Sequence, residues 1–196
     1  MNEKISSILE KIDELEKKLQ EELQKEDRAF LDFEQIGKKI CFRKDIIDRQ
    51  KQELKNLWQY LKDAPIAFIL TAPFIYAMII PAVMLDIFVF VYQSINFPIY
   101  KIQKVKRSDY IVFDRGYLAY LNIIEKINCI YCSYFNGLIA YVAEIAARTE
   151  QYWCPIKHAK KIAYRHSRYN RFFSYGDAKA FREELEELRK ELLLNL

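Results

Sequence analysis

Residues 64–100 read APIAFILTAPFIYAMIIPAVMLDIFVFVYQSINFPIY, and this stretch, with Asp86 as its single charged residue, decides the fold. A straight helix of that length would measure about 55 Å, more than the ~30 Å hydrocarbon core of a bilayer. A turn between Pro81 and Asp86 would keep the carboxylate away from the middle of the bilayer. We therefore predict an apolar helical hairpin in the membrane, either two full spans or a re-entrant pair, in preference to a core helix of a soluble protein.

Residues 1–63 predict a coiled-coil arm. In a heptad frame that starts at Ile5, eight of the nine a positions up to Leu61 are apolar, and the first proline is Pro65. This pattern is typical of a long helix that buries a narrow stripe against a partner. We expect a homo-oligomer to form through this arm, and a hinge near Gly37 could fold it into a helical hairpin.

The composition of the 196 residues favours an all-α fold. Only four glycines and five prolines are present, so the sequence offers few turns for an all-β protein. With 52% hydrophobic residues a disordered chain is excluded, and the net charge of +4 does not demand a nucleic-acid partner. We predict four segments, which are the arm 1–63, the membrane hairpin 64–100, a cysteine- and histidine-bearing helical region 101–176, and an amphipathic helix 177–196 capped by Asp177.

Two pairs of soft metal ligands predict a metal site. Cys129 and Cys132 are three residues apart, and Cys154 and His158 are four residues apart, so each pair would share one face of a helix. If the chain turned back between the pairs, three thiolates and an imidazole would form the tetrahedral set that structural zinc prefers. An iron or iron–sulfur centre has the same ligand types.

Other interpretations of these residues stay open. The cysteines could be small buried hydrophobic side chains, or Cys129 and Cys132 could be a redox dithiol. Nearby Glu144 and Arg148 have the spacing of a helical ion pair. A di-iron site would need an ExxH motif, which the sequence lacks. The candidate second-shell or alternative ligands are Glu125, Glu144, Arg148 and Glu150.

A basic segment at 157–171 contains six cations and no acid, interleaved with aromatic residues. Beside a membrane segment this mixture indicates attraction to anionic lipid head groups. Phosphate attraction alone does not specify nucleic acid, so we favour lipid over RNA. The predicted head-group ligands are Lys157, Lys160, Lys161, Arg165, Arg168 and Arg171.

No catalytic residue is predicted, because the sequence has no GxSxG, HExxH or glycine-rich phosphate loop. We therefore favour a membrane-anchored scaffold or interaction protein with an unidentified protein partner over an enzyme. The alternative is a membrane redox protein that uses an iron centre or the CxxC thiols.

The stretches KRSDYIVFDR and RTEQYWCPIKHA, with the CIYC motif between them, lie within 106–159. Together with the apolar hairpin, they resemble a family of small bacterial integral-membrane proteins to which no activity is attached. The resemblance implies a bacterial inner-membrane protein and covers about 65–160. Basic residues flank the apolar stretch on both sides, so we expect both termini in the cytoplasm.

Overall fold

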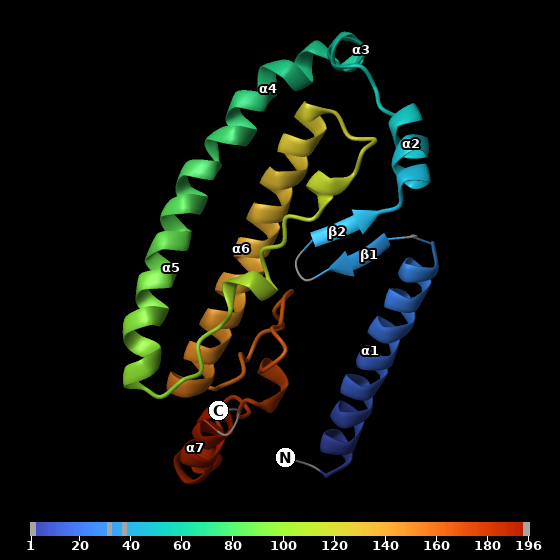
Figure 1. Cartoon of the computed structure of the whole chain (residues 1–196). Coiled ribbons are helices and arrows are strands. Elements are labelled where there is room, and N and C mark those ends of the chain that lie inside the picture. The colour runs from blue at the N-terminus through green and yellow to red at the C-terminus, as the bar shows by residue number, and fades with distance from the viewer. Residues whose placement is uncertain (1–2, 31–32, 37–38, 194–196) are drawn as a thin grey trace. The chain divides into compact units, whose positions relative to one another are not determined.

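The computed structural model describes residues 3–30, 33–36 and 39–193 (Figure 1). The prediction of an all-α fold is confirmed, with one two-stranded hairpin as the exception. The elements are α1 (Glu3–Phe30), β1 (Phe33–Ile36), β2 (Lys39–Phe42), α2 (Lys44–Gln52), α3 (Leu57–Asp63), α4 (Ile66–Ala77), α5 (Ile79–Ile99), α6 (Ile123–Trp153) and α7 (Ala178–Leu193).

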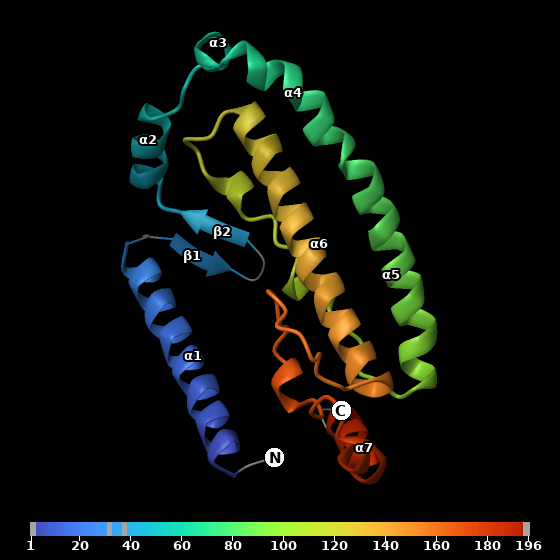
Figure 2. The same cartoon turned by 180° about the vertical axis from the view of Figure 1, so that it is seen from behind.

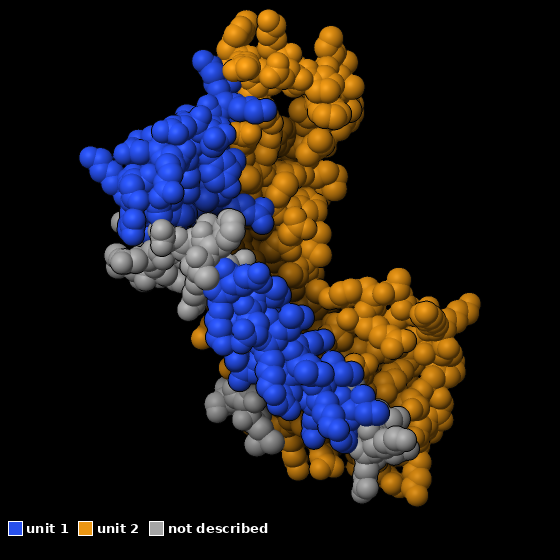
Figure 3. Space-filling model, turned by 90° about the vertical axis from the view of Figure 1, so that its right-hand side faces the viewer, with its two compact units in different colours: residues 1–57, 114–123 blue, residues 58–113, 124–196 orange. Residues whose placement is uncertain are grey.

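The chain divides into two compact units (Figure 3). Unit 1 comprises Met1–Leu57 and Asp114–Ile123, and unit 2 comprises Trp58–Phe113 and Ile124–Leu196. Within unit 1, the backbone N–H of Ala119 donates a hydrogen bond to Gln50 Oε1 at 2.9 Å, which attaches the later segment to α2. These boundaries differ from the predicted ones because a segment distant in sequence completes the first unit.

The predicted unbroken helical arm over 1–63 is wrong. Helix α1 ends at Phe30, and β1 and β2 pair as antiparallel strands with Phe33 opposite Phe42. Aromatic and β-branched residues in both strands suit a pleated surface better than a helix. The predicted hinge at Gly37 lies outside the described residues.

Helices α4 and α5 form a nearly continuous rod with a one-residue break at Met78. The predicted turn between Pro81 and Asp86 is wrong, because α5 runs through both residues. Pro81 lies in the first turn of α5, where its missing N–H would have no helical partner. The proline therefore marks the start of a helix and does not reverse the chain.

The long apolar helices do pair, but the partner of α4 and α5 is α6 (Figures 1 and 2). Tyr76, at the end of α4, donates a hydrogen bond to Asn128 near the start of α6, and the Tyr92 and Thr149 hydroxyls lie 3.1 Å apart near the ends of both rods. The two rods therefore run in the same direction. Residues 101–113, which we call the return segment, run back along them.

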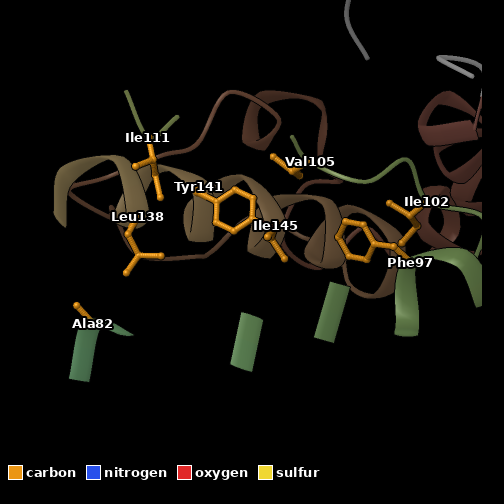
Figure 4. Close-up of a cluster of buried hydrophobic side chains, with 8 residues drawn as sticks. All are labelled: Ala82, Phe97, Ile102, Val105, Ile111, Leu138, Tyr141 and Ile145. Carbon is orange, nitrogen blue, oxygen red and sulfur yellow. The ribbon is translucent and has the colours of Figure 1, made fainter. Parts of the chain in front are cut away.

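The core of unit 2 lies between these three elements (Figure 4). Tyr141 of α6 is fully buried at its centre, and Phe97 of α5 is 1% exposed. The return segment contributes apolar side chains although its sequence is basic. The buried cluster consists of Ala82, Phe97, Ile102, Val105, Ile111, Leu138, Tyr141 and Ile145.

Gly137 lets the return segment approach α6 closely. A Cβ at this position would lie 2.5 Å from the Tyr110 carbonyl oxygen and 3.0 Å from Ile111 Cα. We expect Gly137→Ala to lower the free energy of unfolding by about 2 kcal/mol, although alanine usually favours a helix over glycine. Gly116→Ala is the matched control, because a Cβ at Gly116 meets nothing within 4 Å. Denaturant unfolding measures both, and a stabilised Gly137→Ala protein would contradict the close approach.

After α6 the chain is irregular, with a 3₁₀ turn at Tyr169–Arg171 and one bridge between Ile156 and Phe173, before it enters α7. Asp177 Oδ1 accepts a hydrogen bond from the Ala180 N–H at 3.0 Å, so the predicted N-cap is confirmed. Leu188 and Leu192 of α7 are buried. The Leu188 carbonyl accepts a hydrogen bond from Gln151 of α6, so α7 packs within unit 2 against the end of α6.

Candidate functional site

The principal candidate surface is the outer surface of α4 and α5, defined as the exposed apolar side chains of Ile66–Ile99. Only 6% of the most apolar window of this rod is buried, and helix α4 has no buried residue. The exposed fractions reach 77% at Phe74, 75% at Ile66 and 67% at Phe88. A soluble protein rarely exposes so long a continuous apolar surface.

Two polar side chains of α5, Asp86 and Gln93, lie on the side of the helix that faces the rest of unit 2. Ala82, Asp86, Val89, Gln93 and Phe97 are buried or half-buried and recur at intervals of three and four residues. They form one stripe, which we call the inward stripe. Polar residues inside and apolar residues outside are typical of helices in contact with lipid.

Asp86 is held by a bidentate ion pair. Arg107 of the return segment donates from Nη2 at 2.7 Å and from Nε at 3.2 Å to the two carboxylate oxygens. The Tyr134 hydroxyl of α6 donates to Asp86 Oδ2 at 3.0 Å. The hydrogen bond to Asp86 raises the pKa of Arg107 above its ordinary value, so the guanidinium stays charged. The single charge of the apolar rod is thus paired inside the protein.

Gln93, seven residues or about two helical turns after Asp86, joins the same three elements. Its Nε2 donates to the Tyr141 hydroxyl at 2.6 Å, and its Oε1 accepts from the Val105 N–H at 2.7 Å. Because Gln93 is 3% exposed, both bonds satisfy polar atoms away from water. The Tyr131 hydroxyl also donates to the Ile75 carbonyl at 2.7 Å, so tyrosines bridge the rods from Ile75 to Gln93.

A second ionic cluster surrounds Glu144. The predicted pair with Arg148 is present at 2.8 Å, and Arg168 approaches the same oxygen at 2.9 Å. Arg168 also donates to Gln151 Oε1 at 2.9 Å. Half-buried charges of both signs therefore attach the segment after α6 to α6 itself. The arrangement is structural, since Glu144 accepts from both arginines and Arg148 also donates to the Gln103 carbonyl at 2.6 Å.

The structure does not bring the predicted metal ligands together. Helix α6 is unbroken through Cys129 and Cys132 up to Trp153, so 22 residues of about 1.5 Å rise separate Cys132 from Cys154 by about 33 Å. Cys154 and His158 also do not share a helix, because α6 ends before them. Among the described residues no group of three or more histidines, cysteines or carboxylates could hold a metal ion.

The predicted Cys3His zinc shell required a turn within 133–153, where α6 is an unbroken helix. Of the other predicted carboxylate ligands, Glu150 contacts His166, with Oε2 3.0 Å from Nε2. Glu125 begins α6, far from Cys154. Cys129 and Cys132 remain one helical turn apart as free thiols, and the redox alternative that needs only this pair stays a prediction.

We expect Cys132→Ser and Cys154→Ser to change the free energy of unfolding by less than about 0.5 kcal/mol, because both side chains are exposed. Elemental analysis and denaturant unfolding of the two variants measure this. A loss of stoichiometric zinc together with several kcal/mol of stability would contradict the structure.

Among the predicted head-group ligands, the three arginines have partners within the protein, and the three lysines are exposed or half-buried. Arg168 belongs to the Glu144 cluster, and Arg171 lies 3.7 Å from Glu191. Arg165 lies over the Tyr169 ring, 5.5 Å from its centroid. Lys160 and Lys161 are exposed, while Lys157 is half-buried. Arg168 therefore has structural partners, and binding of lipid head groups by these six residues stays a prediction.

The sequence-based prediction missed the partners of Asp86 and Gln93. Their spacing of seven residues on one helix was a signal that both face one side. No comparable pattern identified Arg107, Tyr134 and Tyr141 as the partners, because these residues are distant in sequence from Asp86 and Gln93.

Two helices, Ile66–Ile99 and Ile123–Trp153, are long and apolar enough to cross a membrane by length and composition. Comparisons with protein families, with curated proteins and with solved structures find no match. The resemblance to small bacterial membrane proteins therefore stays a prediction, and the functional argument rests on the geometry.

Proposed function

We propose that this protein is a membrane-anchored helical scaffold that associates with further copies of itself through α1. The observation that carries the proposal is the outer surface of α4 and α5, which stays exposed along its whole length while Asp86 and Gln93 of α5 are paired inside. Burying such a surface in acyl chains gains about 25 cal/mol for each Å² removed from water.

Aromatic rings and lysines at the C-terminal ends of the rods support a lipid partner. Tyr100, Tyr152 and Trp153 form an aromatic cluster with ring centroids 5.1–5.3 Å apart at the C-terminal ends of α5 and α6. The exposed Lys101 and Lys104 follow directly. Aromatic rings beside cations are typical of a protein surface at the level of anionic head groups.

Flotation of the purified full-length protein with liposomes tests this anchoring. We expect the protein to float with vesicles that contain phosphatidylglycerol and to remain bound in 1 M salt, because apolar burial is not screened. A protein that stays at the bottom of the gradient without detergent, folded and monodisperse, would overturn the proposal.

Helix α1 supplies the proposed self-association surface. Ile8, Ile12, Leu15, Leu19 and Leu23 recur at three- and four-residue intervals and are 44–63% exposed. Charged residues such as Glu14 and Lys18 flank the stripe and pair with each other at 2.6 Å. A second copy of α1 offers a matching stripe, as coiled-coil packing requires.

We expect the double substitution Leu15→Glu and Leu19→Glu to convert the oligomer to a monomer, because it places charge in the α1 stripe. Lys17→Glu with Gln24→Glu is the matched control, since both positions lie on the outer side of the heptad frame. Sedimentation in detergent measures the mass. An unchanged oligomer in the first variant would mean that α1 is not the interface.

A further inference from the structure

We propose that unit 2 lies in one leaflet of the bilayer, with α4 and α5 in the plane of the membrane and the return segment facing water. The inference rests on the proposed membrane anchoring and specifies its geometry. Neither apolar rod crosses the bilayer in this arrangement, although each has the length to do so.

The direction of the rods is the first argument. The α4–α5 rod and α6 contact each other in order, from Tyr76 with Asn128, through Asp86 with Tyr134, to Tyr92 with Thr149. Both rods therefore run the same way. Two parallel spans in one chain require the connection between them to cross the bilayer as well.

The connection cannot cross the bilayer at low cost. The return segment follows the rods, since Val105 bonds to Gln93, Arg107 to Asp86, and Tyr110 approaches Gly137. It is not helical there except for a single 3₁₀ turn. Non-helical backbone and charged side chains are tolerated at membrane depth only where protein or a water-filled cavity surrounds them. Lys104, Lys106 and Asp109 of this segment are exposed.

The ionic cluster around Glu144 adds further charged groups near the C-terminal ends of the rods. Glu144, Arg148 and Arg168 lie on α6 and the segment after it, and Arg148 Nη1 donates to the Gln103 carbonyl at 2.6 Å. Charged groups thus accompany α6 beside the part of α5 that follows Asp86. An orientation in the membrane plane leaves this polar side at the head groups and immerses only the outer surface of α4 and α5.

The length of the rod agrees with this orientation. Its 34 residues span about 51 Å, well beyond the ~30 Å hydrocarbon thickness. Exposed Trp58 precedes the rod and exposed Trp153 ends α6. Tryptophan prefers the interface, where its ring has an apolar body and a polar N–H.

A double-cysteine experiment separates the two topologies. In a background where the four native cysteines are serine, Lys62→Cys and Lys101→Cys mark the two ends of the α4–α5 rod. The full-length protein is reconstituted in sealed phosphatidylcholine and phosphatidylglycerol vesicles and treated with a membrane-impermeant polyethylene glycol maleimide. If both ends lie on one side, every molecule carries two adducts or none, whichever way it inserted. A predominance of single adducts, with two after detergent, would overturn the proposal in favour of a crossing.

Single cysteines identify failure of the anchoring itself. We expect Phe88→Cys to react at least tenfold more slowly in vesicles than Ser108→Cys on outward-facing molecules, and equally fast after detergent. Equal rates in vesicles, with loss of the protein from the floating fraction, would overturn the membrane anchor as well as its orientation. Shielded Phe88→Cys with single adducts at the rod ends would overturn only the orientation.

Discussion

Replacing Phe74 and Phe88 together by lysine is expected to reduce binding of the protein to liposomes about 1000-fold. Both rings belong to the outer surface and are 77% and 67% exposed in the protein alone. A lysine in place of each costs roughly 2 kcal/mol after its stem reaches toward the head groups. Two such sites give about 4 kcal/mol, which corresponds to about three powers of ten in the partition constant.

The matched control adds the same charge to the return segment through Gln103→Lys and Ser108→Lys. Both side chains are exposed on the side that we place in water, so we expect binding to be unchanged or slightly stronger on anionic vesicles. Circular dichroism checks that all variants remain helical. Equal loss in both double variants would show that added charge, and not its position, controls binding.

Removing the cation that pairs with Asp86 of the inward stripe is expected to destabilise unit 2. Arg107→Ala leaves Asp86 without its cation, and the Asp86 side chain is only 14% exposed. An unpaired buried charge costs several kcal/mol, but the Arg107 side chain is 43% exposed and water partly screens the pair. We therefore expect the free energy of unfolding in lipid or detergent to fall by about 2 kcal/mol.

A double-mutant cycle distinguishes the ion pair from simple loss of packing. Asp86→Leu combined with Arg107→Ala removes both charges, so we expect it to be more stable than Arg107→Ala alone. Lys104→Ala is the control, because this exposed cation lies on the same segment. Additive effects of the two substitutions would show that Asp86 and Arg107 do not stabilise each other.

Apart from the strands β1 and β2, the sequence predicted the helical and apolar segments, but not how they are paired. Composition identifies residues 64–100 as a distinct apolar segment, and periodicity finds the stripe of α1. The partner of α4 and α5 depends on tertiary contacts such as those of Tyr134 and Tyr141, which have no local signature. Proline also misled the prediction, since Pro81 can start a helix as readily as it can break one.

In the candidate site, too, local sequence patterns did not reveal which segments come together. Ligand spacing correctly places Cys129 and Cys132 on one helix, and Glu144 beside Arg148. Spacing does not reveal whether the chain turns between two pairs, and α6 continues straight to Trp153. The stretch 127–147 has Glu144 as its only charged residue, no glycine except Gly137 and no proline, which favours an unbroken helix.

Photo-crosslinking from lipid acyl chains tests the central claim most directly. The full-length protein in vesicles that contain a phospholipid with a diazirine on its acyl chain is irradiated, and the modified peptides are identified by mass spectrometry. We expect adducts throughout 66–99 on outward side chains such as Phe74 and Phe88, and none in 101–113. Adducts concentrated in the return segment, or a rod without adducts in vesicles that retain the protein, would contradict the assignment of this surface to lipid.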